Sequence, residues 1–194
     1  MTDTERTIDG RTIYFHGRKL AFETVTSLIG QRENQTIIFG GTSAGGRGSM
    51  VTIDLLVRLL PPSTKVYGLH DSGNYVDVDP YNPDQDSFMD QCQKAYELYD
   101  HPTVNEQCSN EYKGEEWKCL CGKYMLPMVQ TPSQIVFYLY DSYQLHLDIG
   151  QGKQPSDWSR EDCMYAKNQF QAAMIETYET LNANTKHVVF SPTW

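Results

Sequence analysis

The chain has 194 residues, of which 39% are hydrophobic and 21% charged, and its formal net charge is −9. This length is sufficient for a single domain with a sizeable core. The acidic balance, with no basic run to offset it, argues against a nucleic-acid partner. No apolar stretch approaches the roughly 18–20 residues that span a bilayer, and the polar, acidic amino terminus does not have the pattern of a signal peptide.

The five cysteines indicate disulfides rather than a metal site. They lie at positions 92, 108, 119, 121 and 163. Cys119 and Cys121 are separated by one residue, which is too close for the C-x-x-C spacing of zinc and redox sites, so we predict no metal. An odd count leaves at least one thiol without an internal partner. Disulfides are typical of secreted proteins, although an export signal is missing.

Apolar periodicity, capping signals and breakers predict alternating helices and strands. The expected order is a helix over 18–30, a strand over 37–39, a helix over 50–60, a strand over 66–69, a helix over 88–100, a short helix over 119–129, a strand over 134–139, a helix that begins near 159, and a strand over 187–190, with loops or irregular chain over 71–87, 101–118 and 144–158.

This alternation favours an α/β fold with a mostly parallel sheet that carries helices on both faces. We expect residues 1–194 to form a single domain of this kind. Residues 76–118 are expected to be a loop-rich insertion or cap. Functional groups in such sheets gather where the strands end, so the residues that follow each strand are the first candidates for a site.

The strand over 37–39 runs directly into the motif Gly41-Thr42-Ser43-Ala44-Gly45, which matches G-x-S-x-G. A strand, a tight glycine turn and a helix form the context of a nucleophile elbow, where the serine oxygen is exposed on a strained turn. Ser43 is therefore a candidate acyl-transfer nucleophile. The alternative is a phosphate-binding glycine loop, in which Arg47 could contact a phosphate, but neither G-x-x-x-x-G-K-[ST] nor G-x-G-x-x-G is present.

A triad on this fold runs in the order serine, acid, histidine along the chain. Asp141 follows the strand over 134–139 and is the candidate acid, whose role would be to orient and stabilise an imidazolium. A histidine is then expected after the last strand, and none is present. The five histidines lie at positions 16, 70, 101, 146 and 187. We expect each of them to have a surface or packing role.

Several segments together resemble the pectin acetylesterase/Notum family. They follow the family order from about residue 10 to the end and are much more specific than the elbow alone. The matching segments are Gly41-Thr42-Ser43-Ala44-Gly45-Gly46, Leu69-His70-Asp71-Ser72-Gly73-Asn74-Tyr75-Val76-Asp77, Glu115-Glu116-Trp117-Lys118-Cys119-Leu120, Gln130-Thr131-Pro132, Tyr140-Asp141-Ser142-Tyr143-Gln144 and Ser191-Pro192-Thr193.

The resemblance implies a secreted α/β-hydrolase that removes acyl groups, with an acetylated polysaccharide or an acylated protein as the ester substrate and no cofactor. It assigns Ser43 as nucleophile, Asp141 as triad acid and the Ala44 N–H as an oxyanion donor. Asp71 matches an acidic loop residue, with either a structural or a pocket role. Tyr75 either lines the acyl pocket or packs as a buried aromatic residue.

Two family features have no counterpart in this sequence. The glycine-rich G-G-G-W-C segment with the other oxyanion donors would precede it, and the family histidine would follow Ser191-Pro192-Thr193. We therefore expect the fold to lack amino-terminal strands and the carboxy-terminal histidine loop, and this chain alone to be nearly inactive. The alternatives are a non-catalytic binding relative and a truncated gene product that keeps the acyl-pocket scaffold.

Overall fold

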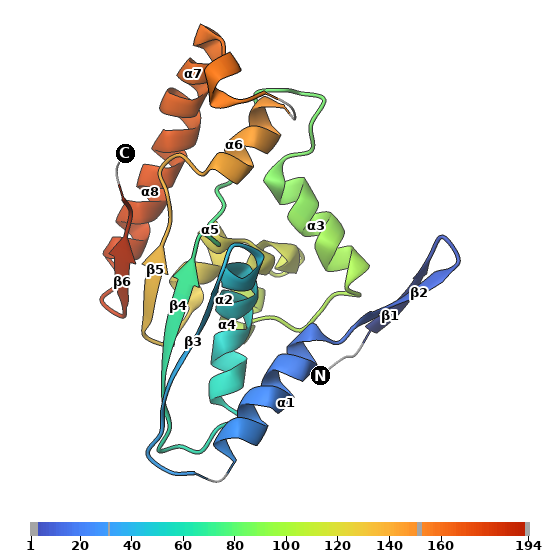
Figure 1. Cartoon of the computed structure of the whole chain (residues 1–194), viewed down its shortest axis with the longest axis vertical. Coiled ribbons are helices and arrows are strands. Elements are labelled where there is room, and N and C mark those ends of the chain that lie inside the picture. Colours follow the sequence, from blue (N-terminus) through green and yellow to red (C-terminus); the bar gives the residue numbers. More distant parts are fainter. Residues whose placement is uncertain (1–3, 31, 151–152, 193–194) are drawn as a thin grey trace.

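The computed structural model describes residues 4–30, 32–150 and 153–192 (Figure 1). Its elements are the strands β1 (Thr4–Ile8), β2 (Arg11–Phe15), β3 (Thr36–Thr42), β4 (Lys65–Asp71), β5 (Ser133–Val136) and β6 (His187–Phe190), the helices α1 (Gly17–Ile29), α2 (Ala44–Val57), α3 (Phe88–Leu98), α4 (Glu106–Glu111), α5 (Gly122–Met125), α6 (Ser142–Ile149), α7 (Arg160–Tyr165) and α8 (Gln171–Asn182), the 3₁₀ turns η1 (Glu116–Leu120), η2 (Leu126–Met128) and η3 (Pro155–Asp157), and the π-helical turn η4 (Ala166–Phe170).

The predicted parallel sheet is confirmed. Its four strands lie in the order β3-β4-β5-β6, and every neighbouring pair is parallel. The register aligns the carboxyl ends, with Thr42 opposite Asp71 and Asp71 opposite Val136. The loops that follow these strands therefore meet at one edge of the sheet, as in other open α/β sheets.

One face of the sheet is buried against the helices. Burial alternates along β4, where Val66, Gly68 and His70 point inward. Val66 belongs to an apolar core cluster that also includes Ile53 from α2 and Met174 from α8. Helices from both halves of the chain therefore cover this face. Alternation of this kind is typical of a strand with only one covered side.

The opposite face departs from the expectation of helices on both sides. Five large apolar side chains project from it and remain 37–73% exposed: Ile38, Tyr67, Leu69, Val188 and Phe190. The physical reason is the strand order. Strands that are added in one direction through right-handed crossovers place all the connecting helices on the same face. The α/β-hydrolase-like architecture itself is as predicted.

Three elements were not predicted, and one of them is the short helix α4, which lies in the expected irregular segment over 101–118. An antiparallel hairpin of β1 and β2 projects from the body and joins α1 (Figure 1). Its turn is formed by Asp9 and Gly10, both at positive φ, which is the dipeptide that favours tight hairpins. The prediction of a loop over 144–158 was wrong in its first part, because α6 occupies Ser142–Ile149.

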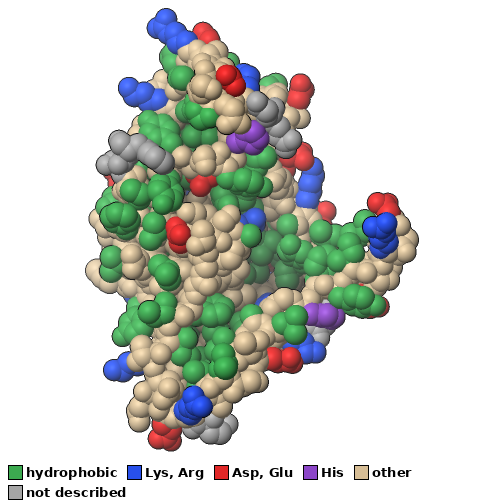
Figure 2. Space-filling model, in the orientation of Figure 1, with side chains coloured by type: hydrophobic (Ala, Val, Ile, Leu, Met, Phe, Trp, Pro, Cys, Tyr) green, Lys and Arg blue, Asp and Glu red, His purple; other side chains and the backbone are tan. Residues whose placement is uncertain are grey.

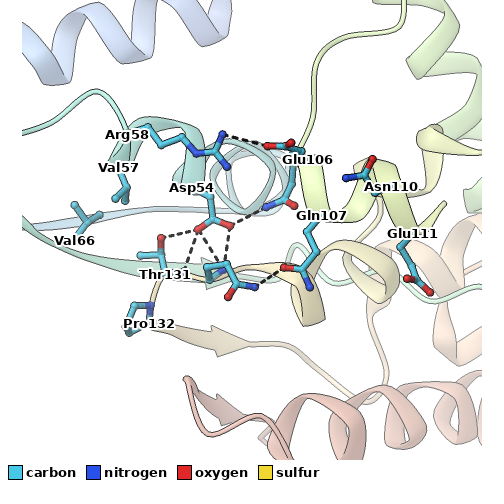
Figure 3. A pocket seen from close by; sticks show the side chains of 12 residues that line it. Asp54, Val57, Arg58, Val66, Glu106, Gln107, Asn110, Glu111, Thr131 and Pro132 are labelled. Atoms are coloured by element: carbon cyan, nitrogen blue, oxygen red, sulfur yellow. Dashed lines mark hydrogen bonds and ion pairs between the residues drawn. The ribbon is translucent and has the colours of Figure 1, made fainter. Parts of the chain in front are cut away.

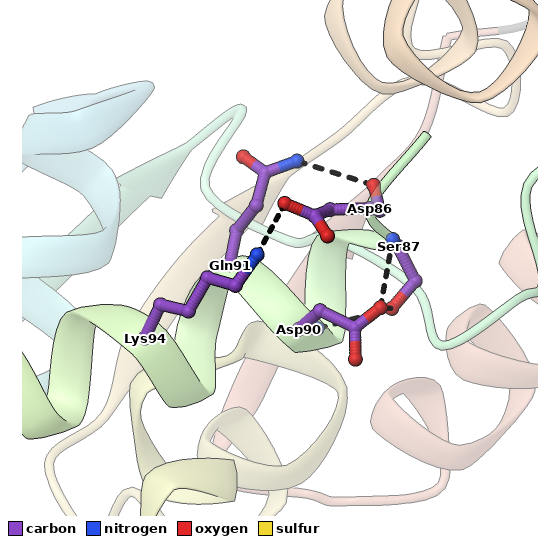
Figure 4. A network of polar contacts seen from close by, with 5 residues as sticks. All are labelled: Asp86, Ser87, Asp90, Gln91 and Lys94. Atoms are coloured by element: carbon purple, nitrogen blue, oxygen red, sulfur yellow. Dashed lines mark hydrogen bonds and ion pairs between the residues drawn. The ribbon is translucent and has the colours of Figure 1, made fainter. Parts of the chain in front are cut away.

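Residues 76–118 contain long loops as well as α3 and α4. The Ser87 side chain caps α3 by accepting from the Asp90 N–H at 3.0 Å, while the Asp90 carboxylate accepts from the Ser87 N–H (Figure 4). Disulfides Cys92–Cys121 and Cys108–Cys119 connect this segment to the chain that follows it. Cys163 is the free and exposed cysteine of the described residues.

Among the residues that the structure describes, no helix combines the length and the apolar character needed to cross a bilayer. The same part of the chain contains no group of three or more His, Cys, Asp or Glu side chains arranged to hold a metal ion.

Candidate active site

Ser43 occupies a sharp bend between β3 and α2. Its backbone has φ 55° and ψ −120°, a conformation that L-residues rarely adopt, and it is the residue immediately before the first turn of α2. Its N–H donates to the Asp71 carbonyl at 2.9 Å, which fastens the bend to the end of β4. Strain of this kind costs on the order of 1–3 kcal/mol and is concentrated at functional sites. The Ser43 side chain is exposed.

Close backbone contacts explain the glycines around Ser43. A Cβ at Gly41 would lie 2.6 Å from the Gly45 carbonyl carbon, and a Cβ at Gly46 would lie 2.5 Å from the Asp71 carbonyl oxygen. Both distances are impossible for real side chains, so larger residues would force the bend open. The glycines thus allow the helix start, β3 and the end of β4 to pack together.

Ala44 is the first residue of α2. The N–H groups of a first helical turn have no acceptor within the helix, and the helix dipole makes this end attractive to negative charge. The Ala44 N–H is therefore in a suitable place to donate to an oxyanion formed beside Ser43. Ala44 also lines a cavity of about 400 Å³, the Ala44 cavity, which lies between α1, α2 and α3.

Tyr75 connects the serine with the acid. The Ser43 hydroxyl lies beside the phenol of Tyr75, a residue that is only 3% exposed. Burial raises the pKa of Tyr75, and the nearby Asp141 carboxylate raises it further. The ring stacks on Phe88 with centroids 4.0 Å apart. Tyr75 is thus a packed aromatic residue that also touches the candidate nucleophile.

Asp141 caps the amino end of α6, and its carboxylate accepts from the Gln144 N–H at 2.8 Å. The residue is 9% exposed. Burial raises the pKa of Asp141, although the backbone N–H groups of Gln144 and Tyr143 oppose this shift. Ser43 directly follows β3 and Asp141 lies in the connection after β5, and the parallel register aligns the carboxyl ends of these strands, so both candidate residues lie toward the same edge of the sheet.

The contacts of Asp71 favour the structural role. Its carboxylate accepts from the Thr42 hydroxyl at 3.1 Å and from the Ser72 hydroxyl at 2.9 Å. Together with the bond from its carbonyl to the Ser43 N–H, these contacts join the ends of β3 and β4. Asp71 does not line the Ala44 cavity.

All five histidines lie within the described residues, and none hydrogen-bonds to Ser43 or Asp141. His70 is buried between the hydroxyls of Ser49 at 2.8 Å and Ser133 at 3.2 Å. Burial and the neighbouring His187 lower the pKa of His70 to about 4, so it is neutral at physiological pH. His101 stacks on Tyr96. These two residues have the packing roles that the sequence predicts.

Two residues that contact the site have no role in the esterase predicted from the sequence, which assigns Arg47 only a possible contact to a phosphate. The Gln144 side chain is fully buried and bonds both the N–H and the C=O of Val76, at 3.0 and 2.8 Å, which fixes α6 against the segment that carries Tyr75. Arg47 lies one turn into α2, and its guanidinium packs over Tyr75 and Phe88. Only the position of Arg47, four residues after Ser43, could have indicated its contact with the site.

A larger cavity of about 820 Å³ lies at the other end of the sheet, beside the start of β4 and the entry to β5 (Figure 3). We call it the Asp54 cavity. Asp54 accepts from the Asn105 side chain at 2.8 Å, from the Thr131 hydroxyl at 2.7 Å and from the N–H groups of Gln130 and Thr131 at 3.0 Å. These hydrogen bonds of Asp54 join separate parts of the fold. Open α/β sheets bind ligands at the opposite, carboxyl edge, so we do not assign the site to this cavity.

Known proteins resemble this chain in sequence and in fold. The family model described as pectinacetylesterase matches residues 1–192. The curated relatives include palmitoleoyl-protein carboxylesterase notum1 of Xenopus laevis, 31% identical over 160 residues, which cover 74% of this chain and 33% of the relative. The mouse palmitoleoyl-protein carboxylesterase NOTUM is also 31% identical over 160 residues, with coverages of 74% and 32%.

Two solved structures of the Wnt deacylase Notum from Drosophila share the fold. One superposes with a TM-score of 0.78 at 25% identity over 98% of this chain and 54% of the solved one, and the other with 0.73 at 24% identity over 90% and 48%. The chain thus spans about a third of the length of these curated relatives and about half of the solved chain. The family model covers nearly all of the present sequence, and the chain belongs to the pectinacetylesterase family.

Proposed function

We propose that this chain carries the nucleophile and the acid of a serine carboxylesterase. Ser43 attacks the ester carbonyl, Asp141 is the acid of the triad, and the Ala44 N–H donates to the oxyanion. The observation that carries the proposal is the backbone of Ser43, which holds an exposed hydroxyl at positive φ between β3 and the amino end of α2. A bend of this kind is the nucleophile elbow of α/β-hydrolases.

The reaction proceeds by acyl transfer. A base removes the proton from the Ser43 hydroxyl as its oxygen bonds to the carbonyl carbon, and the oxyanion is stabilised by backbone N–H groups at the start of α2. Collapse of the tetrahedral intermediate breaks the bond to the alcohol, which takes the proton. Water then attacks the acyl-serine ester and releases the carboxylic acid. The Tyr75 phenol holds the Ser43 hydroxyl in place before attack.

The base is an imidazole that none of the five histidines supplies. His70 is held by Ser49 and Ser133 on the buried face, and His187 lies at the opposite end of its strand. Loss of a triad base costs on the order of a million-fold in turnover. The proposal therefore includes near-inactivity of these 194 residues alone, with the imidazole contributed by a further polypeptide segment.

The substrate of the active arrangement is a carboxylic ester, either an acetylated polysaccharide or an acylated protein. The family name refers to pectin, and the relatives named above act on a palmitoleoyl-protein. The two disulfides are compatible with a location of the protein in the secretory pathway or outside the cell.

Chemical rescue tests the proposal. The chain is assayed with p-nitrophenyl acetate at increasing concentrations of free imidazole, after subtraction of the protein-free rate. We expect negligible turnover without imidazole and an imidazole-dependent rate that is lost in Ser43→Ala and reduced at least tenfold in Asp141→Ala. Ser142→Ala, an exposed neighbour of Asp141, is the matched control and should keep the rate.

Two outcomes would contradict the proposal. Robust turnover without imidazole that disappears in Ser43→Ala would show that the chain contains its own base. An imidazole-dependent rate that is equal in the parent chain and in Ser43→Ala would remove Ser43 as nucleophile and favour the non-catalytic binding relative.

A further inference from the structure

The Ala44 cavity has arginines and no acidic side chain in its described lining, although the chain as a whole has a net charge of −9. Its described lining includes two arginines, Arg18 and Arg47, and no aspartate or glutamate. Most of the remaining wall is apolar and comes from Phe15, Val51, Ala95, Pro102, Val104 and Leu120. Figure 2 shows hydrophobic side chains gathered where the hairpin meets the body of the molecule.

Arg47 carries most of the argument because its charge is not neutralised by the protein. Its Nε is buried and has no hydrogen-bond partner. One Nη donates weakly to the Leu120 carbonyl at 3.3 Å and to the Cys92 sulfur at 3.4 Å. No carboxylate is paired with it among the described residues, and burial lowers the pKa of Arg47 from its usual value.

A buried guanidinium without a counter-charge is costly, and buried charges in proteins are normally paired. The aromatic rings under Arg47 offset part of this cost: the guanidinium carbon lies 5.7 Å from the centroid of Tyr75 and 5.0 Å from that of Phe88. These contacts also fix its position. The free edge of the guanidinium is thus pre-organised, since little side-chain entropy remains to be lost on binding.

The cavity lies directly beside the proposed nucleophile. Ala44, which follows Ser43, forms part of its wall. The ring of Tyr75 packs under the Arg47 guanidinium and its phenol lies beside the Ser43 hydroxyl, although neither Tyr75 nor Ser43 is among the described residues that line the cavity. The wall at Ala44 therefore places the cavity one residue from the serine, and a volume of about 400 Å³ is in the usual range for small-molecule sites.

We propose that the Ala44 cavity is an anion subsite in which Arg47 binds the carboxylate of a ligand with an apolar body. In the setting of the proposed esterase, on which this assignment rests, the ligand is an ester that carries a second, ionised carboxyl group. Guanidinium and carboxylate match as planar partners with two parallel hydrogen bonds. The apolar wall receives the carbon chain between the carboxylate and the ester.

Ligand binding tests the subsite independently of turnover. In Ser43→Ala, which cannot hydrolyse the ester, calorimetry compares monomethyl adipate with neutral dimethyl adipate, and octanoate with octanamide. A hydrogen bond to a charged group is stronger than one between neutral groups, so we expect each anion to bind roughly tenfold or more tightly than its neutral partner. Arg47→Met should abolish this preference, and Arg47→Lys should keep part of it.

Arg58→Met is the matched control, because Arg58 is an exposed arginine that caps the carboxyl end of the same helix beside the Asp54 cavity, and it should leave the preference unchanged. Thermal melting verifies that each variant folds. Equal binding of anions and neutral partners, or a preference that survives Arg47→Met, would overturn the subsite. Preference for octanoate alone would overturn the ester assignment and identify a free fatty-acid anion as the ligand. Failure of imidazole rescue with an intact preference would refute the esterase and not the subsite.

Discussion

Helix α2 carries two half-buried charges that have opposite fates. The carboxylate of Asp54 faces the amino edge of the sheet and accepts hydrogen bonds from Asn105, Gln130 and Thr131. Arg47, two turns earlier, faces the carboxyl edge with an unpaired Nε and no carboxylate partner. The comparison teaches that a charged side chain whose hydrogen-bond partners all come from the protein (a saturated charge) holds the fold together. A charged side chain without such partners (an unsaturated charge) is left available for a ligand.

The strongest test removes the saturated charge. Asp54→Ala leaves the donors of Asn105, Gln130 and Thr131 without their acceptor, so we expect a loss of about 3 kcal/mol in the free energy of unfolding. Urea denaturation measures the change, and Asp84→Ala, at an exposed loop position, is the control. A loss below about 1 kcal/mol for Asp54→Ala would contradict the structural role of Asp54 in this comparison.

Asp148 is an intermediate case, because it is 1% exposed with one oxygen bonded by the Tyr165 hydroxyl at 3.1 Å and the other unpaired. Burial raises the pKa of Asp148 to about 7. The folded state thus keeps a proton that the unfolded chain has already released, so this group lowers stability as the pH rises from about 4 to about 7.

Asp148→Asn should therefore stabilise the chain by about 1–2 kcal/mol at pH 8 and have little effect at pH 4. His70 acts in the opposite direction: its lowered pKa makes stability rise between about pH 4 and 6.5, and this rise should be clearer in the Asp148→Asn variant. Urea denaturation at pH 4, 6 and 8 gives both slopes. The same gain at every pH would contradict the assignment of the charge.

The smallest effect is expected for the unsaturated charge. Arg47→Met keeps most of the side-chain volume and removes a charge that the protein does not neutralise, so the free energy of unfolding should change by less than about 1 kcal/mol or increase. Denaturation in the absence of any carboxylate buffer measures it. A loss as large as that of Asp54→Ala would show that Arg47 is structural and would remove the contrast between the two residues.

The parts of the site that lie at strand ends could be predicted from the sequence. Ser43 and Asp141 each follow a recognisable strand, and parallel pairing brings such positions to one edge. The sequence predicts for Arg47 at most a contact to a phosphate and does not predict its burial, because arginine is normally exposed. Its burial depends on Tyr75 and Phe88, which are distant in sequence and come beneath it only in the folded chain.

Two misses in the fold have different causes. The sequence predicts a loop over most of α6 because the polar residues Gln144 and Asp148 occupy its buried side, at 0% and 1% exposure. The apolar spacing that is typical of a helix is therefore missing. The β1–β2 hairpin is largely exposed on both faces, so no burial pattern marks it. Its turn residues Asp9 and Gly10 were a usable signal that periodicity alone did not detect.

The bare side of the sheet has a consequence for work with the isolated chain. Ile38, Tyr67 and Phe190 point into water from three of the four strands, and β3 and β6 are the edge strands of the sheet within the described residues. Exposed apolar surfaces and edge strands of this kind promote association between molecules. Self-association will therefore limit the protein concentration that can be used in every titration. Light scattering and the binding of a hydrophobic dye should be measured alongside each experiment.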